Sequence, residues 1–241
     1  MRNPTARTAV VAVMLWAPSA WAQTPTHYYN FNNSLADGNG GPALGSDGGT
    51  LGANGYTFDP NKGLTLSGAF TSGASYSIAI NSYFTATNGY RKIVDFKNRG
   101  SDNGYYDING YAQLYPSATG PTAVYSANSL AFTVLTRDAG TQLFSFYVNG
   151  ALQNQFTDAG NLGDFSTPGG LARFFEDDFN TGQNEASGGF VNYIATYDRA
   201  LSANEVAGLS IVNATPEPAS FALLGTGLLA VGGMVRRRVR G

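Results

Sequence analysis

Oxygen-bearing side chains are concentrated in one short stretch of the second half of the chain, residues 176–185. Calcium in proteins is bound by six to eight oxygen atoms from carboxylates, amides and carbonyls, so this composition predicts a calcium site. The spacing matches no fixed calcium signature, and the alternative is a solvated acidic loop. The residues expected to bind the metal are Asp177, Asp178, Asn180 and Glu185.

Tyrosines recur in the middle of the chain, in a stretch that also carries amide and carboxylate groups. Aromatic rings stack on the apolar faces of sugars while amides and carboxylates bond the hydroxyls, so this combination predicts a glycan-binding platform. Because tyrosine is favoured in any strand, the alternative is a strand pair whose tyrosines merely cover a sheet. The residues of this predicted platform are Asn103, Tyr105, Tyr106, Asp107, Tyr111 and Tyr115.

Catalytic constellations are not recognisable in the sequence. There is no cysteine, which excludes thiol catalysis and thiolate metal sites, and no G-x-S-x-G motif. The single histidine, His27, is interpreted as an ordinary strand residue. Arg91, Lys92 and Arg99 flank a predicted strand and are interpreted as surface charges rather than a phosphate site.

We therefore expect a protein without enzymatic activity. Glycoside hydrolysis needs two carboxylates at a set separation, and the acidic stretch at residues 176–178 lies at a loop edge rather than along one strand. The alternative from another functional class is a glycoside hydrolase or lyase that acts through Asp177, Asp178 or Glu185.

The elements that must position these residues are short β-strands joined by tight turns, as residues 129–156 illustrate. Asn149-Gly150 between two apolar runs predicts a two-residue type I′ turn, because both central residues of that turn need positive φ. This register pairs Val148 with Ala151 and Phe146 with Gln153. We expect one face, with Phe144, Phe146 and Val148, to form the core, and the other to carry Leu143, Tyr147, Leu152 and Phe156.

Six Asn-Gly pairs mark further turns along the chain, and no repeat of fixed period is present, which argues against a propeller or solenoid. A Ser-x-x-Glu capping box at Ser202 predicts one short helix, residues 202–209. The other expected strands are residues 27–31, 64–67, 75–80, 92–96, 105–108, 111–115 and 190–197.

Composition supports an all-β fold: hydrophobic residues make up 43%, charged residues only 12%, and glycine is abundant at 31 residues. The formal net charge is −2, but six arginines lie at the two ends, so the central part of the chain is clearly acidic. Nucleic acid is therefore excluded as a partner.

The first 22 residues predict a secretory signal peptide. Arg2 and Arg7 form a positive region, residues 9–17 are apolar, and Ala20-Trp21-Ala22 supplies the small residues that signal peptidase needs. The mature chain is expected to begin at Gln23, with an uncleaved anchor as the alternative.

The C-terminal end combines Pro216-Glu217-Pro218, an apolar segment of residues 219–235 and the cluster Arg236-Arg237-Arg238. The apolar segment approaches the length of a membrane-spanning helix, and the arginines would hold its end in the cytoplasm. These parts, in this order, closely resemble the PEP-CTERM sorting signal of Gram-negative bacteria. The resemblance implies recognition by an exosortase in the inner membrane, cleavage near the motif and outward release, in hosts that commonly make exopolysaccharide. An ordinary C-terminal anchor is the alternative.

Four stretches, YYNFNNSLAD, RKIVDFKNR, FSFYVNGAL and FVNYIATYDRALSANEVAGL, resemble a laminin-G-like, concanavalin A-like jelly roll over residues 27–209. The resemblance implies two packed antiparallel sheets, glycan or protein ligands and a frequently bound calcium, for which Asp37 or Asp47 would be a second position. Glucanases of this fold commonly carry E-x-D-x-x-E on one strand, and this chain does not.

The predicted fold class is thus all-β, a two-sheet antiparallel jelly-roll sandwich with one short C-terminal helix. We expect a signal peptide at residues 1–22, the sandwich at 23–210, a linker at 211–218 and a transmembrane sorting helix with its basic tail at 219–241. The expected function is that of an exported cell-surface or matrix protein whose lectin-like sandwich binds exopolysaccharide. A purely structural matrix role is a further alternative.

Overall fold

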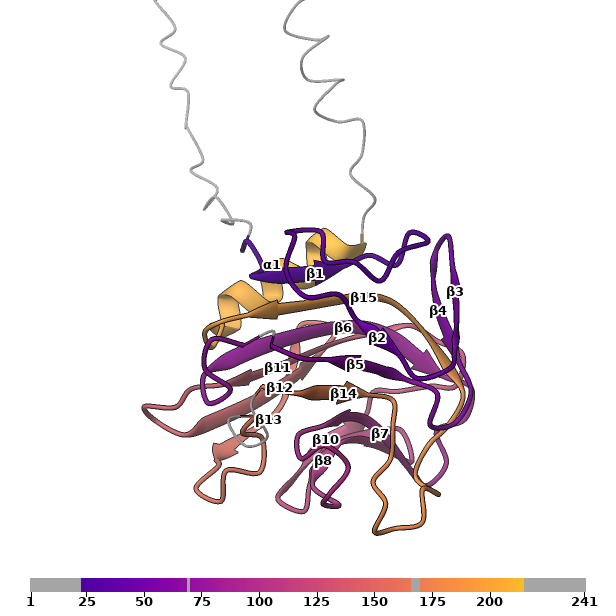
Figure 1. The fold of residues 1–241 in the computed structure, drawn as a ribbon. Helices are drawn as coiled ribbons and strands as arrows, with labels where there is room; N and C mark the ends of the chain where they lie inside the picture. The colour runs from indigo at the N-terminus through magenta and orange to yellow at the C-terminus, as the bar shows by residue number, and fades with distance from the viewer. Residues whose placement is uncertain (1–22, 69, 166–169, 215–241) are drawn as a thin grey trace, which may run out of the picture.

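The computed structural model describes residues 23–68, 70–165 and 170–214, the last five of these by backbone alone. They form two antiparallel β-sheets that face each other, with one helix against the outside of one sheet (Figure 1). The predicted all-β sandwich with a C-terminal helix is therefore confirmed.

Sheet A has eight strands within the described ranges. Its strands are β1 (His27–Tyr29), β3 (Thr50–Gly52), β4 (Gly55–Phe58), β6 (Tyr76–Phe84), β11 (Ala131–Arg137), β12 (Leu143–Val148), β13 (Ala151–Thr157) and β15 (Gly189–Tyr197). Their order is β13-β12-β11-β6-β15-β4-β3, and β1 pairs with the second half of β15. Strands from both ends of the chain thus meet at the centre of this sheet.

Sheet B has seven strands in the same described ranges, in the order β10-β9-β8-β7-β14-β5-β2. The sequence patterns missed β2 to β4, β10 and β14, which are short or rich in small and polar residues. Its strands are β2 (Gly45–Ser46), β5 (Leu64–Leu66), β7 (Tyr90–Asp95), β8 (Gly104–Ile108), β9 (Tyr111–Tyr115), β10 (Ala118–Ala123) and β14 (Ala172–Phe174).

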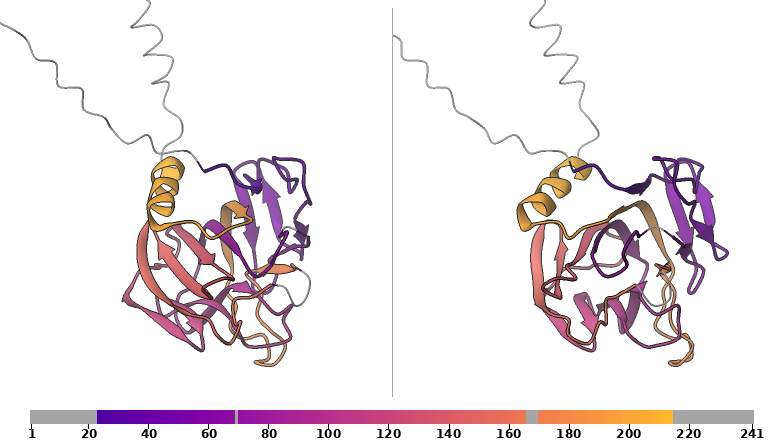
Figure 2. Two further views of the ribbon diagram at one scale, coloured as in Figure 1. Left: turned by 90° about the vertical axis from the view of Figure 1, so that its left-hand side faces the viewer. Right: turned by 60° about the vertical axis from the view of Figure 1, so that its left-hand side comes forward.

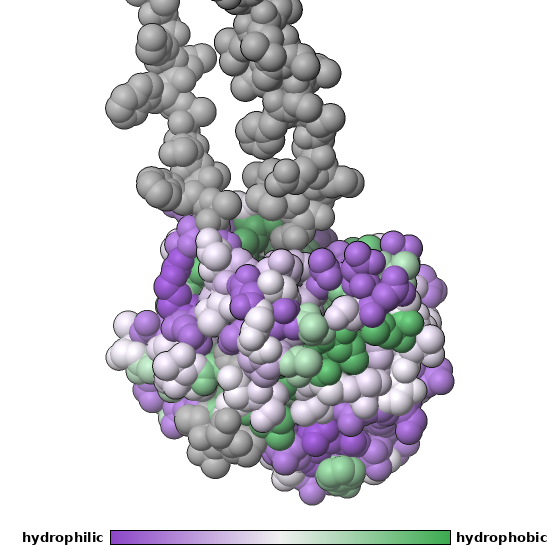
Figure 3. All heavy atoms as spheres, turned by 45° about the horizontal axis from the view of Figure 1, so that its top comes forward, coloured by the Kyte–Doolittle hydropathy of each residue, from purple (hydrophilic) through white to green (hydrophobic). Residues whose placement is uncertain are grey.

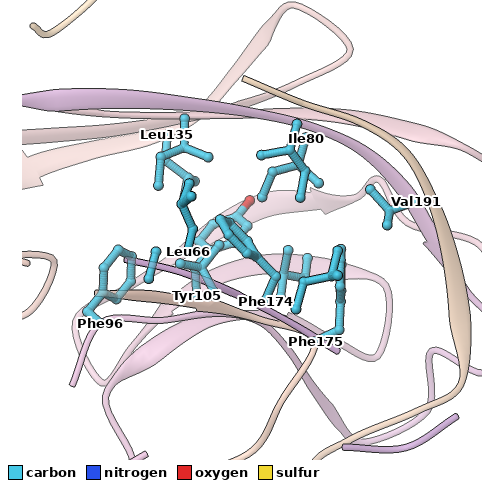
Figure 4. Close-up of a cluster of buried hydrophobic side chains, with 14 of the residues drawn as sticks. Leu66, Ile80, Phe96, Tyr105, Leu135, Phe174, Phe175 and Val191 are labelled. Atoms are coloured by element: carbon cyan, nitrogen blue, oxygen red, sulfur yellow. The ribbon is translucent and has the colours of Figure 1, made fainter. Parts of the chain in front are cut away.

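The core lies between the two sheets and is rich in aromatic rings (Figure 4). Leu135 and Ile80 reach down from sheet A, and Phe174 rises from sheet B to meet them. Phe58 and Phe175 stack with ring centroids 4.3 Å apart. This interlocking aromatic layer fixes how the two sheets face each other.

Helix α1 (Ala203–Ala214) covers part of the outer face of sheet A (Figure 2). Its capping box forms as predicted, because Ser202 N–H donates to Glu205 Oε2 at 2.8 Å. Val206 and Leu209 pack with Phe132 and other residues of that outer face. The helix continues to Ala214, five residues beyond its predicted end at residue 209.

Two of the predicted Asn-Gly hairpin turns are confirmed. Asn149 and Gly150 have φ of 51° and 79°, and Val148 pairs with Ala151. The equivalent turn of residues 109–110 joins β8 to β9. Asn54 also lies in the two-residue turn that joins β3 to β4, whereas Gly55 and Gly104 are the first residues of their strands.

A bulge corrects the predicted register of the central hairpin. The pairing of β12 with β13 shifts between Phe146 and Tyr147, so Phe146 pairs with Asn154 rather than with Gln153. The extra residue turns Phe156 to the core side, where it pairs with Phe144 with ring centroids 5.9 Å apart. The predicted placement of Phe156 on the opposite face is therefore wrong.

The predicted signal peptide, sorting motif and transmembrane segment lie outside the described residues. Among the residues that are described, no helix has the length and apolar character needed to cross a membrane.

Candidate functional site

Strand alternation divides the predicted tyrosine platform between two faces of sheet B. Tyr105 points between the sheets (Figure 4). Its hydroxyl lies 2.9 Å from Tyr125 OH, and Asp107, two residues later, is on the same face of β8. Both side chains are fully buried, so the prediction that they form a glycan platform is corrected. Burial raises the pKa of Asp107 to about 7.

The outer face of sheet B carries the other tyrosines. Tyr106 is buried there between two half-buried neighbours, Tyr90 and Tyr115. The three rings meet edge to face, with centroids 5.5 to 6.2 Å apart. Tyr111 is 39% exposed on the same face, and Asn103 is half-buried just before β8. Here we call Tyr90, Tyr106 and Tyr115 the tyrosine cluster.

Lys92 lies beneath the tyrosine cluster with no exposed surface, which corrects its interpretation as a surface charge. It pairs with Tyr106 across β7 and β8, and the Nζ atom is 5.1 Å from the centre of that ring. The same atom lies 2.8 Å from Asp178 Oδ2, 3.4 Å from Asp95 Oδ2 and 3.5 Å from Asp177 Oδ1. A protein ammonium group therefore occupies the centre of the predicted calcium loop.

The acidic loop folds over this lysine and is fixed to the sheet by its backbone. Lys92 N–H donates to the carbonyl of Glu185 at 2.9 Å. Asp177 Oδ2 accepts bonds from Glu185 N–H and from the Thr181 hydroxyl, so Asp177 organises the loop from within. The Asn180 side-chain amide donates to the Gly100 carbonyl at 3.0 Å. The tyrosine and acidic patterns, predicted as two sites, thus meet in one.

Three carboxylates converge at the edge of the tyrosine cluster. Oxygen atoms of Asp102, Asp178 and Glu185 lie within 4.8 Å of one another. Tyr106 OH donates to the backbone carbonyl of Asp102 at 3.0 Å, whereas Glu185 Oε2 is buried without a hydrogen-bond partner. We call these three residues the carboxylate triad. Asp178 and Glu185 belong to the predicted calcium set. Asp102 was not predicted, and the predicted Asp177 and Asn180 are not part of the triad.

The three carboxyls of the triad have pKa values shifted in different directions. Burial, with the negative charges of Asp102 and Asp177, raises the pKa of Glu185 to about 7. Burial also raises the pKa of Asp102 and Asp95. For Asp178 burial acts in the same direction, but the Lys92 ammonium and nearby amides outweigh it and hold the pKa of this carboxyl below its usual value. The site holds more carboxylates than cations.

The second calcium position implied by the resemblance lies elsewhere. Asp37 Oδ2 lies 2.7 Å from His27 Nδ1, and the carboxylate accepts the backbone N–H groups of Tyr28, Asn39 and Gly41. Both oxygens of Asp37 therefore already accept hydrogen bonds from the surrounding loop and strand. Asp47 directly follows β2, the edge strand of sheet B, and accepts the Thr65 hydroxyl at 2.6 Å.

Comparison with known protein families identifies one motif. Residues 214–238 match the PEP-CTERM protein-sorting motif. The sorting signal predicted from Pro216, Glu217, Pro218 and the arginine cluster is thereby confirmed. It marks the chain for export across the envelope of a Gram-negative bacterium and for processing by an exosortase. A comparison with curated protein sequences finds no match.

Solved structures share the fold at low sequence identity. A sialidase of Trypanosoma rangeli superposes with a TM-score of 0.58 and 14% identity over 78% of this chain, which spans 33% of the sialidase chain. Domain 4 of AbnA, a GH43 arabinanase of Geobacillus stearothermophilus in complex with arabinotriose, gives 0.55 and 16%, covering 77% of this chain and 98% of that one. The Ruminococcus gnavus sialidase CBM40 bound to α2,3-sialyllactose gives 0.51 and 15%, covering 69% and 100%. The fold is therefore one found in carbohydrate-active proteins, while the laminin-G assignment stays a prediction.

Sequence reasoning missed Tyr90, Asp102 and the central role of Lys92. The alternation of side chains along a strand supplied one usable signal. It places Tyr90 and Lys92 on one face of β7, and Tyr106 and Ile108 on one face of β8. The register that joins the two strands, and the loop that covers them, depend on contacts between distant parts of the chain.

Proposed function

We propose that this exported protein binds polysaccharide without cleaving it, through the outer face of sheet B. The observation that carries the proposal is the tyrosine cluster beside the carboxylate triad. Half-buried Tyr90 and Tyr115 and exposed Tyr111 offer apolar ring surface to a sugar face, and Asp102 and Glu185 accept its hydroxyls. The sorting motif and the carbohydrate-bound structural neighbours favour the same function.

Preorganisation supports binding at this face. Tyr106 is fixed from below by Lys92 and through its hydroxyl by Asp102, and its ring contacts both outer tyrosines. A ligand that stacks on these rings therefore orders few additional side chains, which lowers the entropic cost of binding.

Calcium is proposed as a cofactor of this face. The triad supplies hard oxygen donors, and the orphaned Glu185 Oε2 is the atom that a cation would satisfy. Asp102 and Glu185 would hold the ion from the side facing solvent, because Asp178 Oδ2 is already bound by Lys92. The bound ion would supply positive charge for sugar hydroxyls.

A glycoside hydrolase is the second candidate. Glu185, with a pKa of about 7, is suited to act as a general acid, and the ionised Asp178 lies close to it. However, Asp178 has no exposed surface and its Oδ2 atom is held by Lys92 at 2.8 Å. A carboxylate in that position does not reach a substrate, and so we favour binding.

The test is a binding assay with the protein recovered from a host that exports it. We expect binding to the host exopolysaccharide or to a panel that includes arabinotriose and sialyllactose, and an affinity about tenfold lower for Tyr115→Ala. Leu152→Ala, an exposed position on sheet A, is the matched control. Loss of polymer length that disappears in Glu185→Gln would establish the hydrolase instead, and no binding to any polysaccharide would indicate a structural role.

A further inference from the structure

A cavity of about 400 Å³ opens at the end of sheet A where β4, β6 and β15 meet. That volume is within the usual range of small-ligand pockets. We propose that this pocket is a second saccharide-binding site, which takes an uncharged sugar unit. The residues that carry the argument are Thr57, Asp59, Tyr83, Thr85, Ser187 and Gly188.

Tyr83 contributes an aromatic ring to the lining of the pocket, and Phe190 on the neighbouring strand packs against that ring. Register places Tyr83, Phe190 and Thr57 side by side on the outer face of sheet A. The Tyr83 and Phe190 rings stack with centroids 5.6 Å apart and planes inclined by 26°. Gly55 allows this arrangement, because a Cβ atom there would lie 2.2 Å from the Phe190 ring. Tyr83 is half-buried and therefore offers part of its ring to a bound sugar.

The walls of the pocket are hydroxyl groups and backbone. The hydroxyls of Thr85 and Ser187 both donate to the Gly188 carbonyl, at 3.1 and 3.0 Å, which leaves their lone pairs as acceptors. Thr57 and Asp59 are exposed at the rim. The lining residues, all within the described part of the chain, include one carboxylate and no lysine or arginine.

This chemistry selects the class of ligand. Sugar hydroxyls match the mixture of hydroxyl, carboxylate and carbonyl acceptors. A uronic or sialic acid would bring its negative charge beside Asp59 with no cation to compensate it. The pocket therefore favours neutral hexose or pentose units over acidic ones.

The new pocket adjoins the sheet B site but is separate from it. Glu185 belongs to the carboxylate triad, and Ser187, two residues later, lines the pocket. The segment between them is fixed on one side by Lys92 N–H bonded to Glu185 O at 2.9 Å and on the other by Thr85 N–H bonded to Gly188 O at 2.8 Å. Each site thus has its own anchor, and neither needs the other to be occupied.

The test uses calorimetry of the exported protein with neutral oligosaccharides of glucose, galactose, mannose, xylose and arabinose. We expect at least one to bind, with an affinity at least about fivefold lower for Tyr83→Ala because its aromatic contact is lost. The titrations are repeated in the Tyr115→Ala background, which weakens the sheet B site: binding that persists there and is lost on adding Tyr83→Ala reports the pocket alone, so failure of the proposed sheet B function and failure of the pocket are distinguishable.

A second variant keeps the test decisive if Tyr83→Ala disturbs the fold. Asp59 is exposed at the rim, so Asp59→Lys should fold normally and lower the same affinity by placing a long side chain across the opening. The inference is overturned if no neutral oligosaccharide binds, or if a neutral oligosaccharide binds wild type and Asp59→Lys with equal affinity.

Discussion

Arg137 and Lys92 are both buried cations beside carboxylates, yet their surroundings differ. The Arg137 guanidinium donates to Asp158 Oδ2 at 2.9 Å, to the Ala74 carbonyl at 2.6 Å and to Asn161 Oδ1 at 2.7 Å. Asp158 in turn accepts the backbone N–H groups of Leu162 and Gly163. The hydrogen-bond donors of Arg137 and the acceptors of Asp158 are thus matched, and we call Arg137 and Asp158 the closed pair.

In the Lys92 cluster, by contrast, hydrogen-bond donors and acceptors are not matched, and we call this cluster open. One ammonium faces Asp95, Asp177 and Asp178, and the other two members of the triad lie at its edge. Burial raises the pKa of several of these carboxyls, and Glu185 Oε2 has no partner. Carboxylates held together against their mutual repulsion reduce stability, so such an excess points to function, whereas a closed pair points to folding.

The largest expected effect tests the closed pair. Arg137→Met should lower the free energy of unfolding by about 3–5 kcal/mol, because it leaves Asp158 buried and uncompensated. Urea unfolding followed by circular dichroism measures the loss. The double variant with Asp158→Asn should recover part of it, and a loss below about 1 kcal/mol would show that the pair is not the folding element described here.

Lys92→Met should cost about 3 kcal/mol at pH 7.5, since Asp178 and Asp177 lose their cation. Without the Lys92 ammonium, burial would raise the pKa of Asp178, so the variant should regain stability as the pH falls towards 5. Lys62→Met, at an exposed lysine, should change stability by no more than about 0.5 kcal/mol. An equal loss from Lys92→Met at both pH values would contradict an open, carboxylate-rich cluster.

Calcium should bind at the Lys92 cluster and not at the Arg137–Asp158 pair. At a calcium concentration five times the dissociation constant, the wild type should gain about 1 kcal/mol of stability. Thermal unfolding with calcium and with EDTA measures this gain. Asp102→Asn should abolish the gain if the triad binds the ion, and the absence of any shift up to about 10 mM would remove calcium from the proposal.

Glu185→Gln should change the pH dependence of stability, with a definite sign. A carboxyl with a folded-state pKa of about 7 favours folding while protonated, so wild-type stability falls as pH rises from the ordinary carboxyl value of about 4.3 through 7. The variant should lose this fall, with a higher melting temperature than wild type at pH 8 and an equal one at pH 5. Asp178→Asn should do the opposite and lower stability near neutral pH, because the pKa of Asp178 is depressed.

Local signals in the sequence were sufficient for one tight turn and for the start of the helix. The Asn149-Gly150 turn needs positive φ at two adjacent residues, and the Ser202 capping box is completed within one helical turn. Features set by distant contacts were not accessible. The bulge beside Phe146 depends on how β13 fits the core, and it reversed the predicted face of Phe156.

The candidate site was only half accessible for the same reason. Composition identified the tyrosines and the acidic loop, because both are concentrated in short stretches. It did not show that Lys92, 86 residues before Asp178, is buried under them. A lysine next to a strand end is ordinarily solvated, and only the closed tertiary structure shows that carboxylates replace that water.

The position of α1 has a consequence for how the molecule is displayed. Figure 1 shows α1 and β1 on one side of the sandwich and β7, β8 and β10 on the other. The sorting-motif match begins at residue 214, where α1 ends. A surface that holds the molecule by this end therefore meets the helix side, while the tyrosines are turned towards the medium with the full thickness of two sheets behind them. Neighbouring copies anchored in this way would present their tyrosine clusters in parallel, all facing away from the anchoring surface.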